Sequence, residues 1–288
     1  MTLDSASAPA IDSPEIDLAI QASNFTIRNG RQTVIGATNL AIPVGALFVV
    51  SGRFASGKTA LLLALAGRLR GFAGTATVFG HPLRQSGGQV RHLSALAETP
   101  IVNRLDDDLT VERQIAAALV LRQPWWKPLV SAKTVALCLV RVNALLRQVD
   151  ARAGEILEQS HAGLPRLTGT DRIVDLQPLD RAVLGVVVAL IGRPRLLIVD
   201  DVDTLRDTDD RTRAWAALLV LRMAGWHDLT IAASGQDPKE LVEILERIDA
   251  DVHPAPARPV YLLDLEYGRT LTDRTRTAEI LTAPTRKA

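Results

Sequence analysis

The chain contains a glycine-rich segment whose residue types and spacing are suited to holding phosphate groups. Gly52, Gly57, Lys58 and Thr59 stand at the fixed positions of the pattern G-x-x-x-x-G-K-[ST]. Glycines let the backbone turn tightly enough to direct N–H groups at phosphate oxygens, and a following helix start adds its positive dipole end. The lysine would supply a cation to the terminal phosphates, and the threonine hydroxyl a Mg²⁺ ligand. We therefore predict a nucleotide phosphate site at Gly52, Arg53, Phe54, Ala55, Ser56, Gly57, Lys58, Thr59 and Ala60.

A second candidate for chemistry is the acidic pair that follows an apolar run at residues 196–199. Asp200 and Asp201 come directly after Leu-Leu-Ile-Val. An acid at the end of a buried parallel strand lies at the sheet edge where ligands bind. Four apolar residues and an aspartate are a weak signal alone, but they follow a phosphate-binding pattern in the same chain. We predict that Asp200 holds the Mg²⁺ shell beside the phosphates.

The segments around these residues predict the elements that position them. A short buried strand at 46–50 leads into Gly52, and an Ala- and Leu-rich helix at 59–69 follows the turn. Strands at 195–199 and 229–233, with a helix at 211–223 between them, predict a parallel sheet. Residues 16–35 read as a β-hairpin, broken at Asn29-Gly30. From 111 to 157 apolar residues recur at helical spacing, which predicts a helical insert.

Composition limits the possible environments of the chain. Hydrophobic residues make up 47% of the 288 residues, and the formal net charge of +1 argues against a strongly electrostatic partner such as duplex DNA. The single cysteine, Cys138, cannot form an internal disulfide, which favours a reducing cytoplasm. Residues 1–15 lack the basic start and apolar centre of a signal peptide and are predicted to be disordered. The longest apolar stretch, at 182–191, is too short to span a membrane.

Further segments make the chain resemble the ATP-binding subunits of ABC transporters between about residues 16 and 265. They are the segment at 39–45 that leads to the strand before the glycine-rich loop, the helix segment at 61–67, Leu109-Thr110-Val111, and Gly192-Arg193-Pro194-Arg195 before the strand that leads to Asp200. The resemblance implies an α/β fold, a P-loop NTPase with a RecA-like core and a mixed or parallel sheet plus an inserted helical subdomain. It implies one ATP-binding domain at 16–267, with the helical subdomain at about 99–181 and a polar tail at 268–288.

The resemblance also implies how the protein works. ATP and Mg²⁺ are the expected cofactors, with Lys58 and Asp201 as catalytic residues and Thr59, Asp200 and Glu98 as metal ligands. The expected partners are a membrane-spanning transporter subunit and a second ATP-binding subunit, in a homodimer or a heterodimer, and no nucleic acid. The expected location is cytoplasmic, peripheral on the inner face of the cell membrane through the partner.

Several family positions are altered in this chain. The L-S-G-G-Q signature corresponds to Leu-Gln-Pro-Leu-Asp at 176–180, and the catalytic glutamate corresponds to the shorter Asp201. Glu98 stands where the family has a glutamine, and Gln236 where it has a histidine. The aromatic residue that stacks on adenine should lie near Ile27 or Arg28, neither of which is aromatic.

These substitutions leave alternative functions open. The first hypothesis is a transporter subunit that binds Mg-ATP and couples dimer closure to its partner, with slow or partner-dependent hydrolysis. The alternative is a hydrolysis-deficient regulatory subunit that senses nucleotide. An ABC-type ATPase acting on nucleic acid or ribosomes is disfavoured by the single P-loop and the near-neutral charge. Trp125-Trp126 is predicted to pack in the helical insert, or alternatively to form an exposed patch for a membrane partner.

Overall fold

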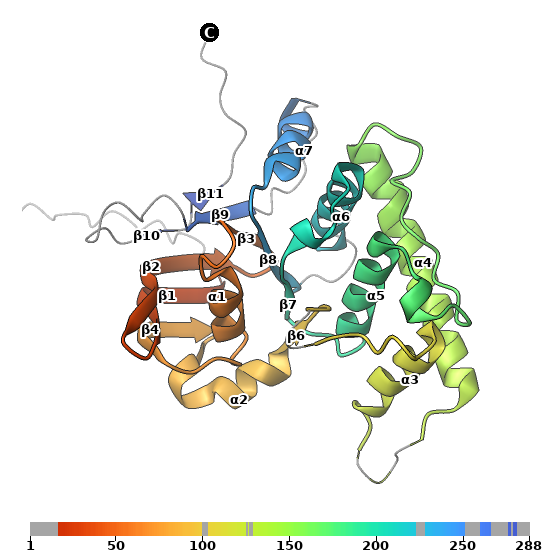
Figure 1. Ribbon diagram of the computed structural model, residues 1–288, viewed down its shortest axis with the longest axis horizontal. Coiled ribbons are helices and arrows are strands. Elements are labelled where there is room, and N and C mark those ends of the chain that lie inside the picture. The colour runs from red at the N-terminus through yellow and green to blue at the C-terminus, as the bar shows by residue number, and fades with distance from the viewer. Residues whose placement is uncertain are drawn as a thin grey trace, which may run out of the picture.

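The computed structural model describes residues 17–99, 103–124, 126, 129–222, 228–250, 260–265, 276–277 and 279–280. It is an α/β fold with two sheets and a helical region to one side (Figure 1). The main elements in chain order are β1 (Leu18–Asn29), β2 (Gln32–Pro43), β3 (Leu47–Ser51), α1 (Lys58–Leu65), β4 (Phe72–Val78), β5 (His81–Pro82), α2 (Leu83–Leu93), β6 (Ser94–Leu96), α3 (Val111–Val120), α4 (Ala132–Ile156), α5 (Pro178–Leu190), β7 (Leu196–Val199), α6 (Thr208–Leu221), β8 (Thr230–Gly235), α7 (Lys239–Ala250), β9 (Val260–Asp264), β10 (Arg276–Thr277) and β11 (Glu279–Ile280).

The larger sheet carries the strands that precede the candidate site residues. Its order is β11-β9-β3-β8-β7-β6, and all neighbours from β9 to β6 pair in parallel. In β3, Phe48 and Val50 belong to one hydrophobic core, whereas Leu47 and Val49 belong to another on the opposite face. Because successive strand side chains point to opposite faces, an unbroken apolar run is needed where both faces are covered. The predicted parallel sheet is confirmed.

The smaller sheet is mostly antiparallel and packs with α1 against one face of the larger sheet. Its order is β10-β2-β1-β4-β5, and β1 and β2 form the predicted hairpin with Asn29 paired to Gln32. Gly30 in the turn has a φ of 59°, a backbone conformation that glycine adopts without a steric cost. Side chains from β1, β2, α1, β3 and β8 share one core, so this sheet supports the helix that follows the glycine-rich loop.

The helical region is built from α3, α4 and α5 and has a small core of its own (Figure 1). The predicted helical insert is confirmed, with α3 and α4 separated at residues 121–131. In that connection Trp126 is 63% exposed, and Leu121 and Leu129 are 85% and 86% exposed. The prediction that Trp126 packs inside the helical insert is therefore wrong, because most of its side chain is exposed. Trp125 lies outside the described residues. The predicted bounds of the subdomain, 99–181, stay a prediction.

Periodicity did not reveal several short elements. The strand β6, the helices α2 and α7, and the two-residue strands β10 and β11 were not anticipated. β10 pairs in parallel with β2 through Arg276 and Thr277, so part of the polar tail joins the smaller sheet. Residues 1–15 lie outside the described part of the chain. Among the described helices, none combines the length and the apolar character that crossing a bilayer requires.

Candidate functional site

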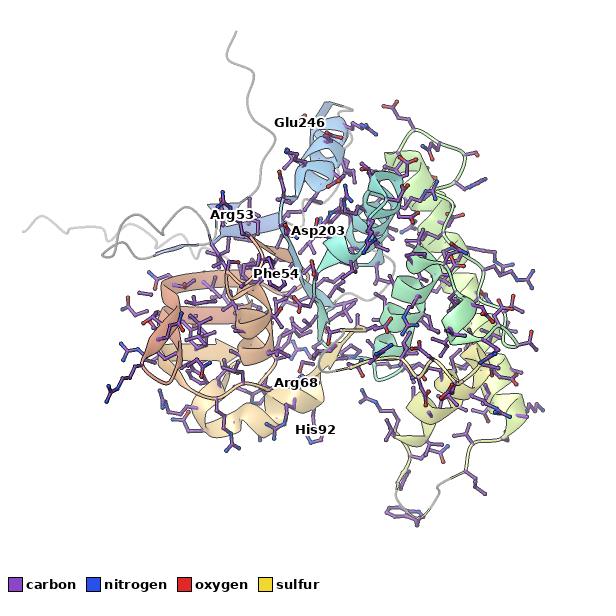
Figure 2. The ribbon with its side chains drawn as sticks, viewed as in Figure 1. Arg53, Phe54, Arg68, His92, Asp203 and Glu246 are labelled. Carbon is purple, nitrogen blue, oxygen red and sulfur yellow. The ribbon has the colours of Figure 1, made fainter. Side chains whose placement is uncertain are left out.

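The glycine-rich loop connects β3 to α1 and depends on two glycines with unusual backbone angles. Gly52 has a φ of 144° and Gly57 a φ of 101°. A Cβ atom on Gly52 would lie 2.8 Å from the Ser56 Oγ, and one on Gly57 would lie 2.9 Å from the Ile35 Cγ1. Other residues would therefore strain the backbone and clash as well. Phe54, at the outer side of the loop, is 86% exposed (Figure 2).

Lys58 turns its ammonium group back into this loop. The Nζ donates hydrogen bonds to the carbonyl oxygens of Gly52 and Arg53, the second at 2.9 Å, and the side chain is buried. Gly57 is the N-cap of α1, and its carbonyl accepts the Leu61 N–H at 2.9 Å. The first turn of the helix and a fixed cation thus meet in one concave loop, the arrangement that binds phosphate in proteins.

The fold joins the loop to the acidic strand end through Thr59 and Asp200. The Thr59 Oγ1 donates to the Asp200 Oδ2 at 2.7 Å, and the Ser234 Oγ donates to the Asp200 Oδ1 at 2.6 Å. The Ser234 Oγ in turn accepts the Asp201 N–H at 2.9 Å. Because β3, β8 and β7 are neighbours in the parallel sheet, their carboxyl ends bring these residues together. Ser234 was not predicted from the sequence. The pattern that could have indicated it is a polar residue directly after the apolar run of β8.

Asp201 has a strained backbone and an unsatisfied carboxylate. Its φ is 65°, in the left-handed region that is uncommon outside glycine. Its Oδ1 is buried with no hydrogen-bond partner. Burial raises the pKa of Asp201, repulsion from Asp203 and Asp200 raises it further, and the Lys58 ammonium opposes the rise. A carboxyl group with a raised pKa is suited to accept a proton near neutral pH.

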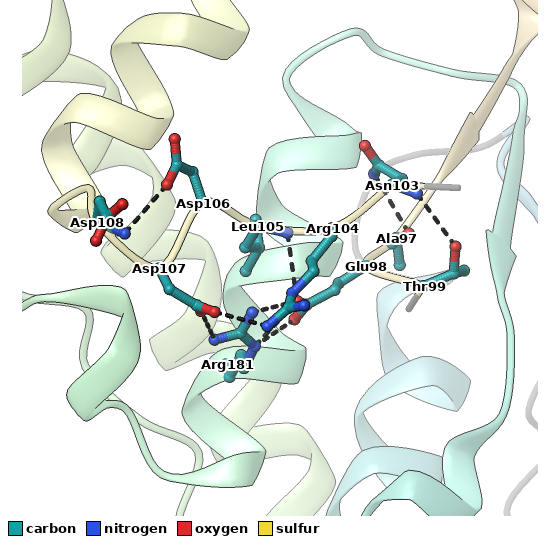
Figure 3. Close-up of polar contacts among 10 residues, drawn as sticks. All are labelled: Ala97, Glu98, Thr99, Asn103, Arg104, Leu105, Asp106, Asp107, Asp108 and Arg181. Atoms are coloured by element: carbon teal, nitrogen blue, oxygen red, sulfur yellow. Dashed lines mark hydrogen bonds and ion pairs between the residues drawn. The ribbon is translucent and has the colours of Figure 1, made fainter. Parts of the chain in front are cut away.

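Glu98 is held by Arg181, a pairing that no sequence pattern indicated. The Arg181 Nε lies 2.9 Å from both carboxylate oxygens of Glu98, and the Nη2 lies 2.6 Å from the Oε1. Arg181 also pairs with Asp107, which lowers the pKa of that carboxyl (Figure 3). Glu98 follows β6 and Arg181 lies in the first turn of α5, so the ion pair links the parallel sheet to the helical region. The assignment of Glu98 to a metal stays a prediction, and both its oxygens already have a cationic partner.

The segment that corresponds to the family signature forms the start of α5. Gln177 is the N-cap and Pro178 the first helical residue, with Asp180 in the first turn. Proline fits this position because its missing N–H would have no partner inside the helix, but the same feature removes a donor that could reach a phosphate. Burial raises the pKa of Asp180, and repulsion from Asp210 and Asp171 adds to the rise.

The remaining family positions lie in different surroundings. The Gln236 carbonyl accepts the Gly52 N–H at 3.2 Å, and the Gln236 N–H donates to the Asp203 carboxylate. Gln236 thus contacts the loop through its backbone, while its predicted role in place of a histidine stays a prediction. Ile27 is buried in the core and presents no surface to a base, whereas Arg28 is exposed.

The donor set of the site fits a nucleotide with Mg²⁺. Mg²⁺ prefers oxygen ligands and is commonly held by one or two protein groups together with phosphate oxygens. The Thr59 hydroxyl and the Asp200 carboxylate are such a pair, 2.7 Å apart at the mouth of the loop. The buried Ser56 Oγ in the same loop has no hydrogen-bond partner. The fold and this donor set fit a P-loop that would hold a nucleotide with Mg²⁺.

Comparison with known proteins agrees with this interpretation. No family model matches the chain. It is 24% identical over 259 residues to a Nod factor export ATP-binding protein I from Rhizobium meliloti, covering 90% of this chain and 69% of the relative. It is 31% identical over 189 residues to the taurine import ATP-binding protein TauB from Sinorhizobium fredii, covering 65% of this chain and 60% of the relative.

A solved structure shows the same fold. The cbiO1 protein from Clostridium perfringens, described as part of the ABC transporter complex cbiONQ, matches with a TM-score of 0.61 at 13% identity. The match covers 85% of this chain and 84% of that protein. The chain therefore has the fold of an ABC ATPase domain and resembles ABC transporter ATP-binding proteins of both import and export types in sequence.

Proposed function

We propose that this chain is the ATP-binding subunit of an ABC transporter, binding Mg-ATP in the loop at Gly52–Ala60. The observation that carries the proposal is the contact between Thr59 and Asp200 at 2.7 Å, beside an ammonium group buried in the same loop. This contact places two oxygen ligands suited to Mg²⁺ next to a loop suited to phosphate, and a Mg-nucleotide needs both. The relatives are named as ATP-binding proteins, which supports the same class of ligand.

Each residue of the site has a separate role in the proposed binding and hydrolysis of Mg-ATP. Lys58 offers its cation to the terminal phosphates once its hydrogen bonds to loop carbonyls are exchanged for phosphate oxygens. Thr59 and Asp200 would hold the metal, and Ser234 fixes the Asp200 carboxylate. Bound Mg²⁺ would neutralise charge that develops on the phosphates. Asp201 is the candidate base that orients or deprotonates the attacking water, and its raised pKa suits that role.

We further propose that nucleotide binding drives closure of a dimer of such domains and that closure is transmitted to a membrane-spanning partner. The relatives include a taurine import and a Nod factor export protein, and the similar solved structure is part of a transporter complex. The expected position is therefore peripheral, on the inner face of the cell membrane. The substituted segment at 176–180 makes slow or partner-dependent hydrolysis the expected behaviour, because Pro178 lacks an N–H and Asp180 adds an acid.

The alternative is a subunit that senses nucleotide without hydrolysing it. It is favoured by the same helix start, since a proline and a carboxyl group there are poor contacts for the phosphate of an opposing subunit. The short Asp201 in place of a glutamate also favours it, because a shift of about 1 Å in a catalytic group can cost on the order of 10²-fold in rate.

The deciding experiment measures Mg-ATP binding and steady-state hydrolysis by the purified chain. Lys58→Ala should lower ATP affinity by about tenfold or more, since it removes charge-assisted hydrogen bonds to phosphate. Lys239→Ala removes the same charge at an exposed site and should change neither ATP binding nor hydrolysis. Binding without turnover, alone and with a co-expressed membrane partner, would favour the sensor. No ATP binding by the folded wild-type chain would refute both functions.

A further inference from the structure

The charges of this chain are strongly segregated along its length. Residues 18–97 contain eight lysines and arginines and no aspartate or glutamate. The whole chain has 33 basic and 32 acidic residues, so the remainder carries 25 basic and 32 acidic ones. The net charge of +1 therefore conceals a basic part, which contains the strands β1 to β6 with α1 and α2, and an acidic remainder. A segregated charge creates a local potential that a near-neutral total does not show.

Within the basic part, three arginines converge on one concave surface. A groove of about 380 Å³ runs between the end of α1, the start of β4 and α2, and Arg70, Arg84 and Arg91 line it. All three side chains are exposed. The rest of the lining includes Gly67, Gly71, Gly87 and Gly88, and no acidic residue lines it.

Two of the three guanidinium groups, those of Arg84 and Arg91, are anchored but keep free donors. The Arg84 Nη2 donates to the Phe72 carbonyl at 3.1 Å, and its guanidinium lies 5.4 Å from the Phe72 ring. The Arg91 Nη1 donates to the Gly67 carbonyl at 3.0 Å. Each guanidinium has five N–H donors, so most of them remain available. Within the described part of the chain, none of the three arginines forms an ion pair.

Neighbouring side chains add to the positive potential. Arg68 follows α1 and lines an adjoining groove together with Arg91 and Arg122, beside His92 near the end of α2 (Figure 2). Burial lowers the pKa of Arg68, and the positive charge of Arg91 lowers it further. Like charges are thus held close together without a compensating carboxylate from α1, β4 or α2.

We propose that the groove lined by Arg70, Arg84 and Arg91 binds a phosphate-bearing anion, at a site separate from the nucleotide loop. Arginine presents a planar fork of donors that matches phosphate oxygens in pairs, and every cation in this groove is an arginine. The phosphate belongs either to a small soluble compound or to the headgroup of an anionic lipid. The site does not depend on the proposed transporter function, because none of its residues lies in the loop at 52–60.

The test uses two probes on the full chain. Inorganic pyrophosphate is titrated calorimetrically in a Lys58→Ala background, which weakens phosphate binding in the nucleotide loop. Phosphatidylcholine vesicles with or without phosphatidylglycerol are used for co-sedimentation. The triple variant Arg70→Ser/Arg84→Ser/Arg91→Ser should lower affinity for the probe that binds by about tenfold or more. The triple Arg→Lys variant should also bind more weakly than wild type, because it keeps the charge but loses the planar fork.

A matched control removes the same charge from the acidic part of the chain. Arg147, Arg152 and Arg166 are exposed, and their triple serine variant should bind like wild type. Circular dichroism and thermal unfolding establish that each variant is folded, and the Arg→Lys variant remains informative if the serine variant is not. Binding of pyrophosphate identifies a soluble ligand, and binding only to phosphatidylglycerol vesicles identifies a lipid. Binding of neither probe, equal loss in the control, or wild-type affinity in the Arg→Lys variant would overturn the proposal.

Discussion

The hydroxyl group of Ser234 donates a hydrogen bond to the Asp200 carboxylate at 2.6 Å. The same oxygen accepts the backbone N–H of Asp201 at 2.9 Å. One fully buried side chain at the end of β8 therefore fixes the carboxylate of one acid and the backbone of the next. This matters for the proposed chemistry, since the left-handed backbone of Asp201 needs a surrounding contact to hold it.

Ser234→Ala should weaken the response of the site to Mg²⁺ more than it weakens nucleotide binding itself. Its loss leaves the Asp200 Oδ1 and the Asp201 N–H without this partner, while Thr59 still donates to the Asp200 Oδ2, and should also cost about 1–3 kcal/mol of stability. The measurement is ATP affinity with and without Mg²⁺, beside urea unfolding. Thr230→Val is the control. Thr230 lies in β8 like Ser234, and its hydroxyl accepts a buried hydrogen bond from the Gly45 N–H, away from Asp200 and Asp201. An equal Mg²⁺ response in both variants would contradict the positioning role.

Asp201→Asn should stabilise the folded chain at neutral pH. The folded-state pKa of Asp201 is raised, so its ionised form costs stability in full above the folded pKa; the cost shrinks as the pH falls below that value and is gone below the unfolded pKa. The stability difference between variant and wild type should therefore shrink toward acid pH in denaturant titrations. Asp237→Asn, at an exposed site, should show no such trend.

The same Asp201→Asn substitution should abolish hydrolysis while preserving ATP binding, if the wild type hydrolyses ATP. Loss of a general base typically costs about 10²–10⁴-fold in rate. Wild-type turnover should fall as the pH drops through the raised pKa of Asp201, because the base must be ionised to accept a proton. Undiminished turnover in the asparagine variant would assign the base to another group.

The ion pair between Glu98 and Arg181 should couple the parallel sheet to the helical region energetically. A double-mutant cycle with Glu98→Gln and Arg181→Gln should give a coupling energy of about 0.5–3 kcal/mol in thermal or denaturant unfolding, because both side chains are mostly buried and doubly hydrogen-bonded. The exposed pair Lys239 and Asp237 is the control, with an expected coupling of at most about 1 kcal/mol. Equal couplings would mean that the buried pair is no more than a surface contact.

Gly57→Ala should damage the loop more than an equivalent change elsewhere. Gly57 and Gly80 both have positive φ angles, so alanine at either position costs about 1–2 kcal/mol of backbone strain. Only at Gly57 would the new Cβ also meet Ile35 and Val34, at 2.9 and 3.0 Å, whereas Gly80 faces open space. ATP binding should therefore fall in Gly57→Ala and stay unchanged in Gly80→Ala, measured alongside thermal unfolding.

Much of the site was available from local sequence. The spacing of Gly52, Gly57, Lys58 and Thr59 specifies a loop between a strand and a helix, because backbone angles and helix starts depend on neighbouring residues. The apolar run before Asp200 specified a buried strand for the same reason. The sequence alone also shows that residues 18–97 are rich in arginine and contain no aspartate or glutamate, although the net charge of the whole chain does not reveal it.

The tertiary structure alone decided which distant groups meet. Glu98 and Arg181 are 83 positions apart, and Asp200 and Ser234 are 34 apart, so no local periodicity links them. Their contacts follow from strand order in the parallel sheet and from the packing of α5 beside β6, which depend on hydrophobic faces far apart along the chain. The sequence thus determined the loop, the strand ends and the balance of charge. Folding determined the Asp201 environment, the partner of Glu98 and the groove where three arginines converge, because side chains meet only after the layers pack.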